Sequence, residues 1–273
     1  MQREPAELPA YRALLVVDMR KFSAEPGREH AEITEMIPNI LQRSFRRCGL
    51  DEFWDDPLFY GTTGDGYFVG NRSQLLPYLL NPFLPTLQEE LAERNADSQR
   101  TIRMRVSVNV GPMTGSRGES LSEGSGDSRI ENHRLLDSLA VRDLLERSGP
   151  STCVGAIVSE RAFQDAVVPA YSGEDPDLYV KVRAEEKEYQ GTAYLRVPNP
   201  SGDLLREGFV RGEEPEPDSA DDAGDDHTAG DAGGPHYLGT HTTSIQMGDG
   251  GIASSGGIHN SSLRTGDPSR GKR

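Results

Sequence analysis

The chain has 273 residues, and its 44 acidic against 29 Lys and Arg side chains give a formal charge of −15 at neutral pH. This charge disfavours binding to nucleic acid or to an anionic membrane, since both are themselves negative. Hydrophobic residues make up 34% of the chain, below the roughly 45–50% of an ordinary globular domain, so we expect part of the chain to lie outside a packed core. The sequence has no apolar run of bilayer length, and Met1–Ala10 does not resemble a signal peptide, which predicts a cytoplasmic protein.

The N-terminal segment predicts a buried strand followed by an amphipathic helix. Ala13–Val17 is a continuous apolar run, typical of a strand buried on both faces, and Asp18 follows it directly. Apolar residues then recur with helical spacing over Glu29–Cys48, with Gly49 as the stop. Pro38 lies inside this pattern and is expected to bend or divide the helix.

A hairpin and a broken helix are expected next. Pro57–Tyr60 and Tyr67–Gly70 are short apolar runs, and the segment between them ends in Gly64-Asp65-Gly66, which predicts a β-hairpin with this sequence at its tip. Ser73–Arg94 has helical spacing but contains three prolines, so we expect a helix in pieces.

The strand predicted over Ile102–Val110 alternates apolar and polar residues. Its polar positions are Arg103, Arg105, Ser107 and Asn109. Because successive strand side chains point to opposite faces, this pattern predicts one buried face and one wet or functional face.

The second half of the predicted domain begins with a Gly/Ser-rich segment, Gly111–Asp127, expected to be a mobile loop. We then expect helices at His133–Arg147 and Glu160–Val168, and strands at Cys153–Val158, Tyr179–Arg183 and Thr192–Val197. The order of elements predicts an α+β fold, ferredoxin-like, with an antiparallel-rich sheet and helices packed mainly on one face.

Two carboxylates carry the strongest chemical signal. Asp18 ends the first predicted strand and Asp65 lies at the hairpin tip, so they converge if these elements are neighbours in one sheet. Paired carboxylates beside a turn into a helix suit Mg²⁺ or Mn²⁺ bound with a triphosphate. The structural alternative is that Asp18 caps the following helix and Asp65 serves only its turn.

These features resemble the class III nucleotidyl cyclase domain, the fold of adenylyl and guanylyl cyclases. The resemblance covers about residues 10–200 and depends on an apolar strand leading into D-x-x-x-F-S at Asp18–Ser23, the G-D-G hairpin, and V-x-V-x-x-G at Val106–Gly111, in this order. It implies that Asp18 and Asp65 bind Mg²⁺ or Mn²⁺ and that backbone amides of Met19–Ser23 hold the triphosphate. The residues it places at the nucleotide are Phe22, Ser23, Gly64 and Gly66. It also implies a homodimer that builds its sites across the interface.

The remaining family positions depart from the pattern. The base-reading lysine of the family falls on Gly61, and the N-x-x-x-R pair that orients the ribose and stabilises the transition state falls on Ala140 and Leu144. Loss of that arginine removes charge stabilisation where negative charge develops. Three hypotheses follow: a degenerate domain that binds a nucleotide or metal, an active cyclase in which Arg103, Arg105, Arg134 or Arg142 substitutes, and a plain scaffold that neither binds nor turns over a nucleotide.

The C-terminal quarter has a different composition. Ser201–Pro235 holds 11 acidic and two basic residues with few apolar ones, which predicts a disordered linker after a domain at residues 1–200. His236–Arg273 is rich in Gly, Ser, Thr and Asn and contains Ile245-Gln246-Met247-Gly248. This tetrad resembles the core of RIP homotypic interaction motifs and of bacterial amyloid signalling sequences, whose stacked copies form amide ladders and dry interfaces. The resemblance implies an effector partner with a matching segment, and the alternative is a soluble, flexible tail.

Overall fold

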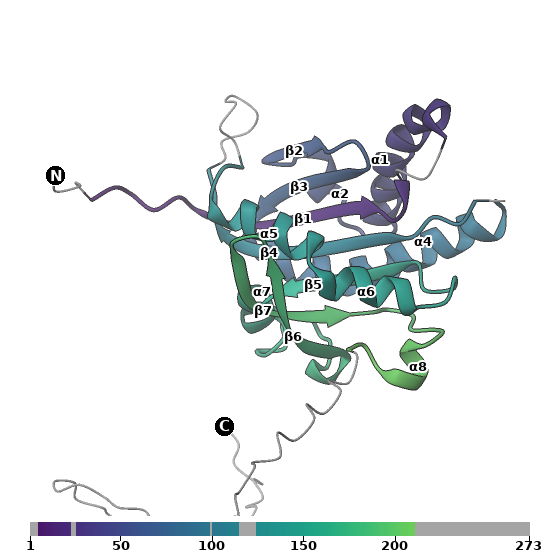
Figure 1. Ribbon diagram of the computed structural model, residues 1–273. Coiled ribbons are helices and arrows are strands. Elements are labelled where there is room, and N and C mark those ends of the chain that lie inside the picture. The colour runs from purple at the N-terminus through teal and green to yellow at the C-terminus, as the bar shows by residue number, and fades with distance from the viewer. Residues whose placement is uncertain (1–4, 23–25, 99, 115–123, 211–273) are drawn as a thin grey trace, which may run out of the picture. The chain divides into compact units, whose positions relative to one another are not determined.

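Figure 1 shows the computed structural model, which describes residues 5–22, 26–98, 100–114 and 124–210. The chain divides into two units after Pro217, and only the first contains described residues. Ser23, most of the Gly111–Asp127 segment and the Ile245–Gly248 tetrad therefore lie outside the described residues. Within the described ranges, no helix is both long and apolar enough to cross a bilayer.

A mixed sheet forms the centre of the fold (Figure 1). In the described chain it has seven strands in the order β2-β3-β1-β4-β5-β7-β6. The strands are β1 Tyr11–Met19, β2 Phe59–Thr62, β3 Gly66–Arg72, β4 Met104–Pro112, β5 Val154–Ser159, β6 Tyr179–Glu186 and β7 Tyr189–Arg196. The β4–β5 pair is parallel and the other neighbours are antiparallel. The predicted antiparallel-rich α+β fold is confirmed.

Helices cover both faces of this sheet (Figure 1). One face packs against α1 His30–Arg47, α2 Asp51–Asp55, α3 Leu76–Tyr78, α4 Leu84–Ala96 and α7 Glu160–Ala166, and the other against α5 Asp127–Asp137, α6 Leu139–Arg147 and α8 Leu204–Glu207. Strand β1 supplies both cores, because Leu15 and Val17 join the first cluster and Leu14 and Val16 join the cluster on the opposite face. The first face holds more of the helices, as expected, but the second is covered as well.

Helix α1 matches its predicted range to within one residue at each end. Its buried stripe includes Ile33, Ile37, Leu41 and Phe45, and Pro38 lies inside the helix without dividing it. The segment Ser73–Arg94 is broken as predicted, into a 3₁₀ turn, α3, a π-helical segment and α4.

The helix predicted at His133–Arg147 is two helices, and the first begins earlier. Asp127 starts α5, and Ser138 separates α5 from α6 with an extended backbone at ψ 148°. The Ser138 hydroxyl donates to the carbonyl of Leu135 at 2.7 Å. A serine that satisfies a helix-end carbonyl favours a break over a continuous helix.

Three of the four polar positions predicted for this strand are not wet, while the fourth, Arg105, is partly exposed. Arg103, Ser107 and Asn109 are buried. The Ser107 hydroxyl donates to the Asn132 carbonyl at 3.0 Å, and the Asn109 amide donates to the Ser128 carbonyl at 2.9 Å. Helix α5 therefore covers this face at Ser107 and Asn109 and satisfies these two polar groups.

The folded chain extends beyond the predicted boundary at residue 200. Leu204 on α8 is buried, and Phe209 packs against the same core on the second face. Arg147, at the end of α6, donates to the carbonyls of Gly208 at 3.1 Å and Phe209 at 2.6 Å. These contacts are why residues 201–210 are ordered, although the segment was assigned to the linker.

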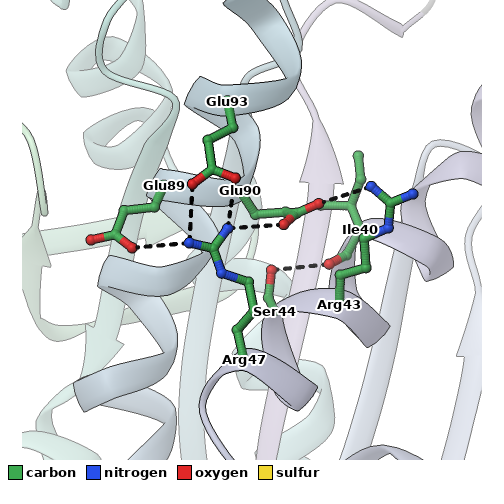
Figure 2. Close-up of polar contacts among 7 residues, drawn as sticks. All are labelled: Ile40, Arg43, Ser44, Arg47, Glu89, Glu90 and Glu93. Carbon is green, nitrogen blue, oxygen red and sulfur yellow. Dashed lines mark hydrogen bonds and ion pairs between the residues drawn. The ribbon is translucent and has the colours of Figure 1, made fainter.

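Figure 2 shows a charged cluster between α1 and α4. Arg47 donates to Glu90 at 3.1 Å and to both carboxylate oxygens of Glu93 at 2.9 and 3.0 Å, and it also reaches Glu89. Glu90 is buried and is shared with Arg43 at 3.2 Å. The cluster joins α1 to α4 through ion pairs between their side chains.

Candidate functional site

A cleft of about 470 Å³ opens where β1 ends. Because β1 pairs with β3, the turn after β1 meets the hairpin tip here, as expected from the sequence. The opposite wall is α6. The lining residues are Met19, Arg20, Lys21, Phe22, Asp65, Arg105, Leu139, Arg142, Asp143 and Glu146.

Asp18 lies behind this cleft and is paired with Arg105. The two residues are directly opposed on β1 and β4. The Arg105 Nε donates to Oδ1 of Asp18 at 2.8 Å, and a terminal guanidinium nitrogen donates to Oδ2. Asp18 is only 7% exposed, and burial raises its pKa to about 6, opposed by Arg105 and increased by the charges of Asp65 and Asp137.

The predicted metal ligands are thus at the same end of the sheet, but Asp18 is already neutralised. Mg²⁺ and Mn²⁺ need carboxylate oxygens that point into the site. Both Asp18 oxygens instead face Arg105. Among the described residues, no group of three or more His, Cys, Asp or Glu side chains is placed to hold a metal ion. As arranged, the residues do not fit the two-metal site that the family resemblance implies.

The turn after β1 uses some of the amides that were expected to hold phosphate. The Met19 N–H donates to the Asp65 carbonyl at 2.8 Å, and the Arg20 N–H donates to the Arg103 carbonyl at 2.9 Å. These two amides are therefore committed to the fold. The bonds hold the turn against the hairpin tip and against β4.

Of the described residues predicted at the nucleotide, one lines the cleft. Phe22 lines it and stacks on His30 with ring centroids 4.4 Å apart. Gly64 and Gly66 are not among the lining residues. The Gly64 carbonyl accepts from the Thr34 hydroxyl at 2.9 Å, and Gly66 is packed where a β-carbon would lie 2.4 Å from the Val17 carbonyl oxygen. Both glycines shape the hairpin.

Cationic side chains line the cleft, and the sequence reasoning missed two of them, Arg20 and Lys21. Arg20 and Lys21 come from the turn after β1, and Arg142 comes from α6. Arg20 donates to Glu146 across the cleft at 3.0 Å, and the Glu146 side chain is 64% exposed. The signal available in the sequence was the Arg-Lys pair two positions after Asp18.

The positions at which the cyclase resemblance expects a lysine, an asparagine and an arginine lie outside the cleft lining. Leu144 is fully buried, and Ala140 packs partly against the same core. Gly61 lies on β2 opposite Phe68. None of the three is a lining residue of the cleft.

The four arginines considered as substitutes have different positions. Arg105 and Arg142 line the cleft. Arg103 is buried and donates to the carbonyls of Leu145, near the end of α6, and of Thr152, just before β5, and burial lowers its pKa to about 10. Arg134 lines a separate pocket beside Glu188.

Comparison with known proteins gives structural likeness only. No protein-family model matches the sequence, and no curated protein matches it. Similar solved structures include a bacterial light-regulated adenylyl cyclase (12% identity, 74% of this chain and 56% of that chain, TM-score 0.49). A second is the catalytic core of a rhodopsin-guanylyl cyclase with converted specificity in complex with ATPαS (13% identity, 72% of this chain and 97% of that chain, TM-score 0.45). A third is the monomeric guanylyl cyclase domain of the RhoGC fusion protein from the aquatic fungus Blastocladiella emersonii (12% identity, 70% of this chain and 96% of that chain, TM-score 0.44). At these identities and TM-scores, the likeness does not itself establish a family or an activity.

Proposed function

We propose that the folded unit is a nucleotidyl cyclase-like signalling domain that binds a nucleoside triphosphate or related nucleotide without turning it over. The observation that carries the proposal is the cleft at the end of β1, where Arg20, Lys21 and Arg142 meet in a chain with a net charge of −15. Asp65, Asp143 and Glu146 also line the cleft, so its cations are partly balanced by neighbouring carboxylates. An anionic ligand that takes the place of these carboxylates gains charge-assisted hydrogen bonds from the cations.

Three features support binding over catalysis. Asp18 is held by Arg105 and does not offer free oxygens. Leu144, at the position of the transition-state arginine, is in the core, and Gly61 has no side chain to read a base. An oriented cation at the developing charge is worth several kcal/mol of barrier in enzymes of this kind, about 3–4 kcal/mol for a single donor.

The test uses the full chain with each of the four common nucleoside triphosphates, with Mg²⁺, with Mn²⁺ and with neither. The readouts are thermal stabilisation and the release of pyrophosphate and cyclic product, measured by mass spectrometry. Stabilisation by one nucleotide without product supports the proposal. Product that disappears in Asp65→Asn would make the protein an active cyclase instead, and absence of any binding would refute both.

The second part of the proposal concerns residues outside the described structure. The acidic linker predicted to end at Pro235 is followed by a Gly/Ser/Asn-rich tail that contains Ile245-Gln246-Met247-Gly248. Together they have the composition of a tether that carries a self-templating segment. We extend the proposal to recruitment of an effector that carries a matching segment, through a homotypic, amyloid-like contact.

This part is tested on the full chain by thioflavin fluorescence and electron microscopy. Wild-type protein is expected to form fibres, and replacement of the tetrad by four alanines is expected to abolish them. A scrambled tetrad of the same composition is the matched control. Equal behaviour of all three proteins would leave the tail without the proposed role.

A further inference from the structure

Arg105 occupies the side of Asp18 that a metal ion would need. Its guanidinium bonds both carboxylate oxygens, and a third nitrogen lies 3.5 Å from the Leu136 carbonyl at the end of α5. The pair lies between two directly opposed positions of adjacent strands. Its position is therefore fixed by the sheet register rather than by a flexible loop.

Burial makes this pairing hard to replace. The side chains of Arg105 and Asp18 are 16% and 9% exposed. A guanidinium remains protonated at any physiological pH, so a dication approaching Asp18 meets a fixed positive charge. Displacing Arg105 would also leave that charge without its carboxylate partner in a partly buried position, which is unfavourable.

The cleft offers cations where the family pattern would have metal ions. Arg20 and Lys21 follow Asp18 in the turn, and Arg142 faces them from α6. The contact between Arg20 and Glu146 is open to competition, because Glu146 is largely exposed. A polyphosphate can replace that carboxylate and gain charge-assisted hydrogen bonds from Arg20.

We infer that this cleft binds the polyphosphate of a nucleotide without a divalent cation, with Arg105 neutralising Asp18 in place of a metal and Arg20 binding phosphate. The phosphate part rests on the proposed function. The statement about the metal stands on the Asp18–Arg105 pair alone.

The metal part is tested by electron paramagnetic resonance of Mn²⁺ added to the full chain without nucleotide. Acidic residues elsewhere bind Mn²⁺ weakly in every variant, so the comparison with Asp18→Asn isolates the site. We expect the wild-type and Asp18→Asn titrations to superimpose. A Mn²⁺ site present in the wild type and lost in Asp18→Asn overturns the inference. If Asp18→Asn does not fold, Asp65→Asn at the hairpin tip gives the same comparison.

The phosphate part is tested with a fluorescent nucleoside triphosphate in EDTA and in excess Mg²⁺. We expect dissociation constants within about threefold of each other, and about tenfold weaker binding by Arg20→Gln, since a charge-assisted contact is lost. Arg183→Gln, on the exposed edge strand β6, is the matched control for loss of one charge. Binding that requires Mg²⁺ overturns the inference. Absence of binding under both conditions overturns the proposed function and the phosphate part, and the Mn²⁺ comparison still decides the metal part.

Discussion

The ring of Phe68 on β3 lies directly against Gly61 on β2. A β-carbon at position 61 would lie 2.6 Å from Cζ of Phe68. Phe68 is itself buried, and the Arg129 guanidinium lies 4.1 Å from its ring centroid. The position that the cyclase resemblance assigns to a base-reading lysine is therefore covered by an aromatic ring from the neighbouring strand.

The close approach of Phe68 predicts that position 61 tolerates only glycine. Gly61→Ala is expected to lower the free energy of unfolding by about 1–3 kcal/mol, since the buried ring must move. Urea denaturation of the full chain measures this. Gly27→Ala is the control, because a β-carbon there meets no atom within 4 Å. Equal midpoints for Gly61→Ala and the wild type would show that the ring moves freely.

An arginine at position 144, where the cyclase resemblance expects one, should disrupt the fold rather than create activity. Leu144 is fully buried, and an unpaired charge there should cost more than about 3 kcal/mol. Leu139→Arg, on the same helix at 74% exposure, should change stability by less than about 0.5 kcal/mol. Thermal unfolding followed by circular dichroism compares the two. A stable Leu144→Arg protein would contradict the placement of α6.

For the charged cluster in Figure 2, we expect the loss of stability on substitution to differ between its buried and its exposed members. Arg47→Met removes one of the two arginines that neutralise buried Glu90, and we expect a loss of about 1–2 kcal/mol. Glu93→Gln changes a side chain that is 65% exposed, and the loss should be within about 0.5 kcal/mol. Urea titrations at low and high salt measure both losses. Similar effects that both vanish in salt would mean that the cluster acts only as surface ion pairs.

His133 predicts how stability depends on pH. Burial lowers its pKa below 6.5, as do Arg129 and Arg134, against the opposing charge of Asp137. Below pH 6.5 the unfolded chain binds a proton that the folded chain does not, so stability is lost as the pH falls. Wild-type stability relative to His133→Gln should therefore decrease from pH 7 to pH 5. An imidazole titration in the folded protein above pH 6.5, seen by NMR, would contradict this.

The sequence predicted those elements whose pattern is local. The apolar run at Ala13–Val17 and the helical spacing over Glu29–Cys48 depend on burial of neighbouring residues, and both elements are observed. The break at Ser138 was missed because apolar residues continue on both sides of it. When hydrophobic spacing continues across a single serine, the pattern predicts one helix rather than two.

The site required information that the sequence pattern does not contain. Alternation along β4 placed Arg105 on the polar side of its strand, but not opposite Asp18, because the register between two strands separated by more than 80 residues depends on the whole sheet. Likewise, alternation along β4 predicts a wet or functional face, because nothing local shows that α5 covers Ser107 and Asn109.

Arg147 gives the end of the folded chain a fixed relation to the cleft. It bonds Asp143, a lining residue of the cleft, at 2.8 Å, and it holds the carbonyls of Gly208 and Phe209. A ligand that changes the position or charge balance of Asp143 thus acts on the residue that anchors positions 208 and 209. The cleft wall and the last described residues of the chain are therefore coupled through a single side chain at the C-terminal end of α6.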